Sequence, residues 1–381
     1  MSGPPLVQWL EGGRTHQARW RSEAALPPPR RVQVVDDTLS ADAAWRLASE
    51  GTALLWRSDF HNARQLLQAM GRRADRKPRR AVLPAPSGAQ AFHLHRQAQG
   101  QRSRVLGSLL IELQGDYGIG LPRAPDIRAA CREAWGPADG QSSVASLREL
   151  QGLVGAHEWR KKGVEIPQLG PPPHNRVHPH YGVFSPVRGE YLDLVASAPL
   201  PSKELAFDIG TGTGVLAAIL ARRGVRRVIA TELAPRALAC ALDNVARLGL
   251  EEQVQVVQAD LFPPGRAPLV VCNPPWLPAR PSAPLECAIY DEESRMLRGF
   301  LAGLAQHLAP GGEGWLVLSD LAEHLGLRTR AELEAWIGAG GLSVVARADV
   351  RPRHPKAADA SDPLHEARTR EVTSLWRLAA M

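Results

Sequence analysis

The sequence has few cysteines and none of the patterns on which cysteine-based structures depend. Four cysteines are scattered over 381 residues, and no two of them form a Cys-x-x-Cys pair. This spacing excludes a zinc site built from cysteine pairs and a disulfide framework, so a reducing compartment is expected. Three histidines, His174, His178 and His180, lie close together, but no carboxylate or thiol pattern accompanies them. We therefore expect an ordered loop there and no metal site.

The sequence also lacks a long apolar run. No stretch approaches the roughly 20 apolar residues that a membrane helix needs, and the N-terminus lacks the charged-then-apolar order of a signal peptide. We therefore expect a soluble, cytoplasmic protein with no membrane partner. With 44% hydrophobic residues, the chain is long enough for two or three domains with sizeable cores.

Positive charge is concentrated in one part of the chain. The net charge is +7, and residues 51–100 hold nine Lys or Arg against two acids, so the rest of the chain is neutral overall. Such a cluster is suited to nucleic-acid phosphates, although a solvated, Arg-rich linker explains it equally well. The candidate nucleic-acid contacts are Arg72, Arg73, Arg76, Lys77, Arg79 and Arg80.

The first part of the chain predicts a mixed α/β accessory region over residues 1–165. The proline-rich run at 26–31 indicates the end of an N-terminal tail, and residues 40–56 and 60–73 have helical spacing. Ser40 is a candidate N-cap and Gly71 a candidate helix end. Two further proline-rich runs follow, at 77–89 and at 167–180, and the latter has the composition of a connection between domains. We therefore predict an accessory, substrate-recognition region at 1–165 and a second domain at 166–381.

After residue 200 the pattern becomes a regular alternation of strands and helices. Such alternation implies right-handed crossovers and a mostly parallel sheet that is buried on both faces. The fold class predicted for this part is α/β, with a doubly wound, mostly parallel, seven-stranded, Rossmann-like sheet closed by an antiparallel pair. The acidic run at 290–295 indicates the start of a helix, because carboxylates favour a helix N-terminus.

A glycine-rich turn, DIGTGTG at 208–214, follows the first strand of this domain. Glycines allow a tight turn and let a ligand approach the main chain. The same residues satisfy a permissive Gly-x-Gly-x-x-Ala pattern, so a nicotinamide dinucleotide remains an alternative ligand at this point. Glu232 ends the second strand, where a carboxylate can accept both hydroxyls of a ribose. Asp260 ends the third strand and suits an adenine amino group.

A polar, proline-rich tetrapeptide ends the fourth strand. Proline removes a ladder donor, so the strand must stop near Cys272, and Asn273, Pro274, Pro275 and Trp276 then lie at its carboxyl end. The prolines fix their own φ angles and restrict the residue before them. Cys272 has no evident positive partner that would make it a thiolate, so we expect it to be a core residue.

With these four motifs in this order, residues 181 to about 320 resemble a class I S-adenosylmethionine-dependent methyltransferase. They are most similar to the small-domain group with an Asn-Pro-Pro-aromatic motif, which includes release-factor glutamine and ribosomal-RNA methyltransferases. Residues 181–195 match the segment that covers the cofactor pocket in this family. The resemblance implies methionine contacts for Asp208, Gly210, Gly212 and Gly214, a ribose contact for Glu232, and adenine contacts for Asp260 and Leu261.

The motif at 273–276 explains how a planar nitrogen can become a nucleophile. The lone pair of an amide or ring-amino nitrogen is delocalised, and two fixed acceptors can hold its N–H groups so that the lone pair points at a methyl carbon. The side-chain oxygen of Asn273 and the carbonyl of Pro274 are the predicted acceptors, and Trp276 offers a face for stacking.

The sequence does not decide which molecule accepts the methyl group, and it leaves alternative functions open. An RNA base and a protein glutamine both present a flat NH₂ group, so the predicted partner is an RNA or protein substrate. Alternatives are a non-catalytic RNA-binding or assembly platform on the same fold and, less favoured, an NAD-dependent oxidoreductase.

Overall fold

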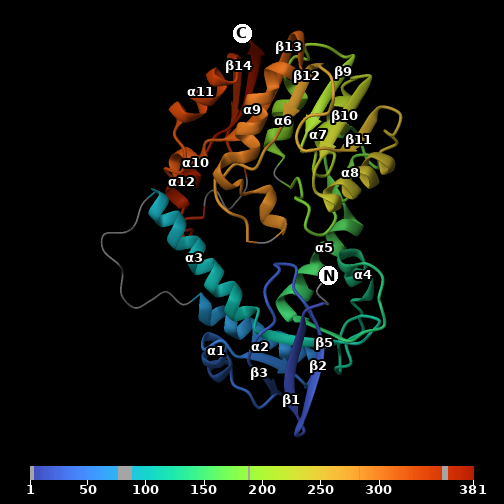
Figure 1. The fold of residues 1–381 in the computed structure, drawn as a ribbon, viewed down its shortest axis with the longest axis vertical. Coiled ribbons are helices and arrows are strands. Elements are labelled where there is room, and N and C mark those ends of the chain that lie inside the picture. Colours follow the sequence, from blue (N-terminus) through green and yellow to red (C-terminus); the bar gives the residue numbers. More distant parts are fainter. Residues whose placement is uncertain (1–3, 76–87, 188, 283, 354–358) are drawn as a thin grey trace. The chain divides into compact units, whose positions relative to one another are not determined.

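The computed structural model describes residues 4–75, 88–187, 189–282, 284–353 and 359–381. The chain forms two compact units (Figure 1). The first contains residues 1–86 and 93–158, and the second contains residues 87–92 and 159–381. The sequence predicted a division at 165/166, whereas the compact units divide at 158/159 and the second unit includes a short segment from before the division.

The first unit is built around a six-stranded mixed sheet in the order β1-β2-β6-β5-β4-β3. Its strands are β1 (Leu6–Glu11), β2 (Arg14–Arg21), β3 (Val32–Val35), β4 (Ala53–Trp56), β5 (Leu109–Leu113) and β6 (Ser143–Ser146). The helices are α1 (Ala41–Ser49), α2 (Phe60–Ala74), α3 (Gly88–Leu106), α4 (Arg128–Trp135) and α5 (Leu147–Lys162), of which α3 and α5 contain residues of both units. The predicted mixed α/β character is confirmed.

Three details of the first unit differ from the prediction. The expected N-terminal tail is a β-hairpin, in which β1 pairs with β2 and Gly12 and Gly13 turn with positive φ angles of 58° and 76°. Helix α1 begins after Ser40, whose side chain accepts a hydrogen bond from the Ala43 amide, but residues 53–56 form a buried strand. Gly71 does not end α2, because it is buried inside the helix, which continues to Ala74.

The second unit contains the seven-stranded sheet, in the order β11-β10-β9-β12-β13-β15-β14. Its strands are β9 (Leu205–Ile209), β10 (Arg227–Glu232), β11 (Val254–Gln258), β12 (Ala267–Cys272), β13 (Leu308–Ser319), β14 (Leu342–Val350) and β15 (Thr373–Ala380). The five strands from β9 to β13 are parallel to one another, and β15 is antiparallel to both β13 and β14. The predicted doubly wound sheet with a closing antiparallel pair is confirmed.

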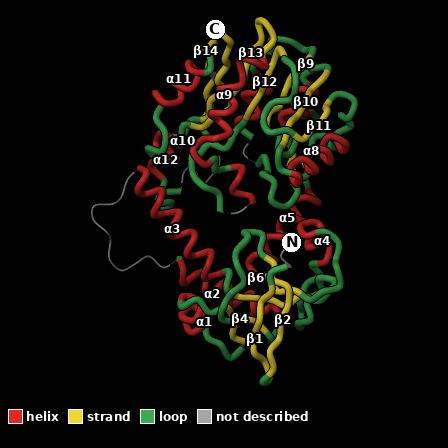
Figure 2. The backbone as a smooth tube through the Cα atoms, viewed as in Figure 1, coloured by secondary structure: helices red, strands yellow, loops and turns green. Residues whose placement is uncertain are grey.

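Helices cover both faces of this sheet (Figure 2). They are α6 (Glu190–Ser197), α7 (Val215–Arg222), α8 (Pro235–Arg247), α9 (Arg295–His307), α10 (Leu321–His324), α11 (Arg330–Ala339) and α12 (His365–Arg370), and a small antiparallel pair joins β7 (Val164–Glu165) to β8 (Arg176–Val177). Helices α6, α7 and α8 pack on one face of the sheet, and α9 and α11 pack on the other.

Alternate residues of β9 show why the strand is buried on both sides. Ala206 belongs to the core under α6 and α7, whereas Phe207 and Ile209 belong to the core under α9 and α11. Residues 167–180 are not a connection between domains. They lie within the second unit, where Leu169 and Val177 are buried in the core beside α7. Among the described residues, no helix is long and apolar enough to cross a membrane.

Candidate active site

The four predicted motifs lie at one edge of the seven-stranded sheet. The pairing places Ile209 of β9 between Thr231 of β10 and Cys272 of β12, so the residues after these strands emerge side by side. Strand β11 is paired with β10 up to Glu232 and Gln258. The glycine loop therefore lies between Glu232 on one side and Asn273 on the other. This is the carboxyl edge of the parallel strands, where open α/β sheets bind ligands.

The glycine loop needs glycine at three positions. Gly210, Gly212 and Gly214 have φ angles of 69°, 58° and 82°, which residues with a side chain rarely adopt. A Cβ atom at Gly212 would meet no atom within 4 Å, so this part of the loop faces open space. The loop therefore leaves room for a ligand against its main chain before α7 begins at Val215.

One carboxylate oxygen of Asp208 accepts no hydrogen bond from the described part of the chain. Its carboxylate is buried, and Oδ2 accepts hydrogen bonds from the Thr211 hydroxyl at 2.5 Å and the Ala217 amide at 3.0 Å. The other oxygen, Oδ1, is buried with no hydrogen-bond partner among the described residues. Burial raises the pKa of Asp208 to about 6, against the effect of these two hydrogen bonds. A buried acceptor without a donor fits a ligand that brings one, as the ammonium group of the methionine part of S-adenosylmethionine would.

Glu232 connects the end of β10 to the glycine loop. Oε2 accepts a hydrogen bond from the Gly212 amide at 3.1 Å, and Oε1 accepts from the amides of Leu233 and Ala234 at 2.9 and 3.0 Å. A carboxylate oxygen can accept two hydrogen bonds, so Oε2 retains capacity for a hydroxyl. The arrangement therefore fits one hydrogen bond from a ribose hydroxyl at Oε2. A second hydroxyl could bond to Oε1 only if it replaced the hydrogen bond from the Leu233 or the Ala234 amide.

Asp260 has a partner that the sequence did not indicate. Oδ2 forms an ion pair with Nη2 of Arg295 at 2.7 Å. Leu261, the next residue, has a φ of 69° and packs against the core under α9. No local pattern connects residues 260 and 295, because the two are brought together only when α9 begins beside the end of β11.

Asn273 is held by the aromatic residue of its own motif. The indole Nε1 of Trp276 donates a hydrogen bond to Asn273 Oδ1 at 2.9 Å. Because the indole can only donate, the amide atom that faces it must be the Asn273 oxygen and not the nitrogen. This hydrogen bond uses one of the two acceptor positions of that oxygen. Trp276 is partly buried and packs against the cores on both faces of the sheet. Asn273 therefore has one acceptor position left for a substrate N–H, in a fixed orientation.

Two neighbours of the motif have the roles expected for them. Cys272 is fully buried, and burial raises the pKa of its thiol well above the ordinary value, so it is a packing residue. Asp291 accepts hydrogen bonds from the amides of Met296 and Leu297 at 3.0 and 3.1 Å, at the start of α9. The acidic run at 290–295 is therefore a helix start.

The histidines at 178 and 180 make structural contacts. His178 Nδ1 lies 2.6 Å from the carbonyl of Arg160, and His180 Nε2 lies 3.0 Å from Asp243 on α8. Among the residues that the structure describes, no group of three or more His, Cys, Asp or Glu side chains is arranged to hold a metal ion.

The predicted nucleic-acid patch is only partly described. Arg72 is exposed near the end of α2, and Arg73 forms an ion pair with Asp42. Arg76, Lys77, Arg79 and Arg80 lie outside the described residues. The patch therefore stays a prediction.

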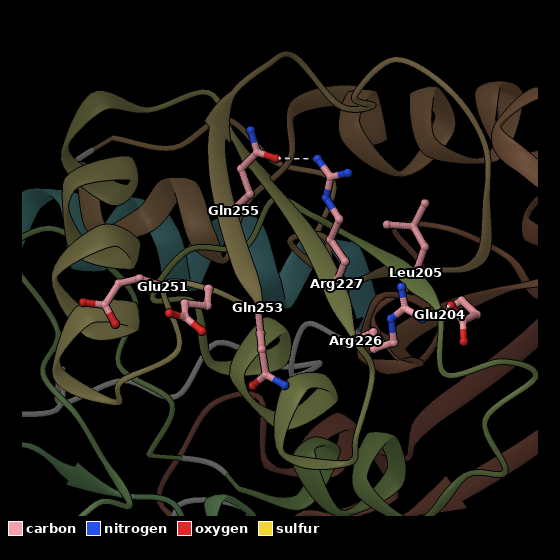
Figure 3. Close-up of a pocket in the computed structure, with 8 residues that line it drawn as sticks. Glu204, Leu205, Arg226, Arg227, Glu251, Gln253 and Gln255 are labelled. Atoms are coloured by element: carbon pink, nitrogen blue, oxygen red, sulfur yellow. Dashed lines mark hydrogen bonds and ion pairs between the residues drawn. The ribbon is translucent and has the colours of Figure 1, made fainter.

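A pocket of about 640 Å³ lies at the opposite edge of the sheet, at the amino ends of β9, β10 and β11 (Figure 3). In its lining, Arg226 forms an ion pair with Glu204 at 3.2 Å, and Arg227 donates a hydrogen bond to Gln255 at 2.9 Å. Because all four motifs lie at the carboxyl edge, this pocket is not part of the candidate site.

Comparisons with known proteins agree with the motifs. A family model described as the methyltransferase small domain matches residues 175–339. A release factor glutamine methyltransferase of Cereibacter sphaeroides is 36% identical over 130 residues, which are 33% of this chain and 43% of that protein. The chain thus spans less than half the length of this relative.

The matches to two other relatives span a larger share of those proteins. A release factor glutamine methyltransferase of Mycolicibacterium smegmatis is 33% identical over 222 residues, 54% of this chain and 72% of that protein. A tRNA (adenine-N6)-methyltransferase of Shewanella loihica is 26% identical over 185 residues, 45% of this chain and 72% of that protein. On its sheet order, its motifs and these similarities, the chain belongs to the class I S-adenosylmethionine-dependent methyltransferases with a methyltransferase small domain.

Proposed function

We propose that this protein transfers a methyl group from S-adenosylmethionine to a planar NH₂ nitrogen of a macromolecule. The observation that carries the proposal is the Asn273 amide oxygen. It lies at the carboxyl end of β12, beside the glycine loop, and the Trp276 indole fixes its direction. Methyl transfer to a planar nitrogen requires such a fixed acceptor, whereas hydride transfer does not.

Some residues of the site would bind the cofactor, and others would orient the substrate nitrogen. When bound, S-adenosylmethionine supplies a methyl carbon that its sulfonium charge has activated. Asp208 and Glu232 would hold its methionine and ribose parts, and Asp260 with Leu261 would hold the adenine. Gly210, Gly212 and Gly214 would let it approach the main chain. The protein then has to place the nucleophile in line with the methyl carbon.

Orientation of the nucleophile is the task of the motif at 273–276. Asn273 Oδ1 would accept one N–H of the substrate and the Pro274 carbonyl the other, so the nitrogen lone pair points at the methyl carbon. S-adenosylmethionine would supply the methyl group and keep the electron pair of its S–C bond, and the substrate nitrogen held by these two acceptors would release one proton to solvent. Pro275 stiffens the turn, and neither acceptor has to reorganise during the reaction.

Two acceptor classes have support. The excess of seven positive charges in residues 51–100 favours RNA, because each neutralised phosphate releases counterions. The relatives named as release factor glutamine methyltransferases favour a protein glutamine side chain. Both acceptors present the same flat NH₂ group to Asn273.

Labelling of an extract separates these acceptors. The protein is incubated with S-adenosylmethionine carrying a tritiated methyl group and an extract from cells that lack it, and the product is treated with RNase or protease. Solubilisation by RNase identifies RNA, and solubilisation by protease identifies a protein. The matched control is Asn273→Ala, which should bind the cofactor but incorporate no label. Equal incorporation by this variant would contradict the proposal.

A further inference from the structure

The start of α9 contacts the candidate site at three places. We call residues 291–296 the clasp. Its first residue, Asp291, donates its amide to the carbonyl of Leu277 at 2.9 Å, and Leu277 directly follows the motif at 273–276. The Asp291 carboxylate accepts the amides of Met296 and Leu297. The clasp is thus attached at one end to the segment that directly follows the Asn273 motif.

The clasp also packs against the glycine loop. A Cβ atom placed at Gly210 would lie 2.3 Å from Cε of Met296, a distance that real Cβ contacts do not show. Met296 therefore lies directly on the main chain of Gly210. A side chain at position 210 would force the end of the Met296 side chain to move and would strain a φ of 69°.

The third contact is the ion pair between Arg295 and Asp260. Nη2 of Arg295 lies 2.7 Å from Oδ2 of Asp260, and the side chains are 67% and 52% exposed. Among the described residues, Arg295 is the partner of this oxygen, and the carboxylate has a second oxygen, Oδ1, that can accept from another donor. The pair therefore orients Asp260 without using all of its acceptor capacity.

We infer that Arg295 is a positioning residue for the cofactor. It holds Oδ2 of Asp260 so that Oδ1 is presented to the adenine amino group. The inference rests on the proposed function, because it takes Asp260 as the adenine acceptor. The inference assigns a role to a residue outside the four motifs, and it places the clasp beside the bound cofactor.

The size of the effect follows from the exposure of the pair. Exposed ion pairs contribute about 0.2–1 kcal/mol, and an adenine that covers the pair brings the effect to the upper end of that range. Loss of Arg295 should therefore weaken S-adenosylhomocysteine binding by about threefold to fivefold.

The test uses the full chain and isothermal calorimetry with two ligands. One is S-adenosylhomocysteine, and the other is S-inosylhomocysteine, in which an oxo group replaces the adenine amino group. The variants are Arg295→Ala and the conservative Arg295→Lys. The matched control is Arg226→Ala, which removes an ion pair of similar exposure with Glu204 at the opposite edge of the sheet. Thermal unfolding verifies that each variant is folded.

The expected result is specific to the ligand and to the residue. Arg295→Ala weakens S-adenosylhomocysteine binding about threefold to fivefold and leaves S-inosylhomocysteine binding unchanged, because only the first ligand has the amino group. Arg295→Lys restores most of the loss, and Arg226→Ala changes neither affinity. In an Asp260→Ala background, the Arg295 substitution has no further effect.

Two results would overturn the inference. Unchanged S-adenosylhomocysteine affinity in Arg295→Ala would show that the pair does not matter for binding. Equal weakening of the binding of both ligands would show that Arg295 supports the structure of the site and does not orient Asp260 toward the adenine amino group. Both leave the proposed function intact, whereas a wild-type protein that binds no S-adenosylhomocysteine would refute the proposed function and this inference with it.

Discussion

The Asp208→Asn substitution should stabilise the ligand-free protein and weaken its cofactor binding. Burial raises the pKa of Asp208 to about 6, and the negative charge of Glu232 adds to the rise. The ordinary value is about 3.9, so the rise corresponds to about 3 kcal/mol of free energy that the ionised carboxylate costs the folded state. This cost is absent below about pH 4, where the group is protonated in both states, and is fully present above about pH 6.

Asparagine removes this cost because it stays neutral at every pH. Its side-chain oxygen can still accept from Thr211 and Ala217, the two donors that Oδ2 now serves. At about pH 7.5 the variant should therefore be more stable than the wild type by up to about 3 kcal/mol, and the difference should vanish towards about pH 4. Affinity for S-adenosylhomocysteine should fall about 10- to 100-fold, because the ligand's ammonium loses a charged acceptor worth about 1.5–3 kcal/mol.

Urea unfolding at several pH values measures the first effect, and calorimetry measures the second. The control is Glu313→Gln, because the Arg377 guanidinium lowers the pKa of Glu313. That variant should be less stable than the wild type at neutral pH, the opposite sign. A difference between Asp208→Asn and wild type that is the same at all pH values, or an unchanged ligand affinity, would refute the argument.

Three further predictions concern the substrate acceptor, the ribose site and a helix cap. Asn273→Ala should reduce turnover at least about 100-fold, because a preorganised polar contact is lost, while calorimetry shows S-adenosylhomocysteine affinity within about twofold of wild type. Full turnover would exclude the orientation mechanism. Glu232→Gln should weaken S-adenosylhomocysteine about tenfold, since a charged acceptor becomes neutral, and unchanged affinity would remove Glu232 from the site. Thr329→Ala removes the capping box with Glu332 at the start of α11. It should lower the free energy of unfolding by about 1 kcal/mol without a change in ligand affinity, and loss of binding would contradict this.

The second unit could be predicted from the sequence because its signals are local. Strands β9, β10 and β12 contain buried apolar residues and are followed by a turn or a polar residue, and the crossovers fix the hand of the connections. In the first unit the same approach missed the β1–β2 hairpin. Gly12 and Gly13 between two alternating segments are a signal for such a turn, but the polar residues of β2 and the prolines that follow obscured it.

Helix propensity also gave one wrong boundary. Gly71 has the composition of a helix end, yet it is buried in α2, and Nη2 of Arg102 would lie 3.8 Å from a Cβ at this position. This distance is an ordinary van der Waals contact, so the space around Gly71 does not by itself require glycine. The helix continues to Ala74 although glycine inside a helix costs about 1 kcal/mol, because the buried residues on the same face of α2 are held in the core.

The sequence by itself determined the order of the motifs and the edge of the sheet on which they lie. Strand ends, glycine turns and prolines act over a few residues, so they can be recognised without knowledge of the fold. Only the tertiary structure decided the partners of each side chain. Within the described part of the chain, it left Asp208 Oδ1 without a donor, and it paired Asp260 with Arg295, 35 residues along the chain. Such partners depend on which strands become neighbours and where a helix begins over them, and these are properties of the packed fold.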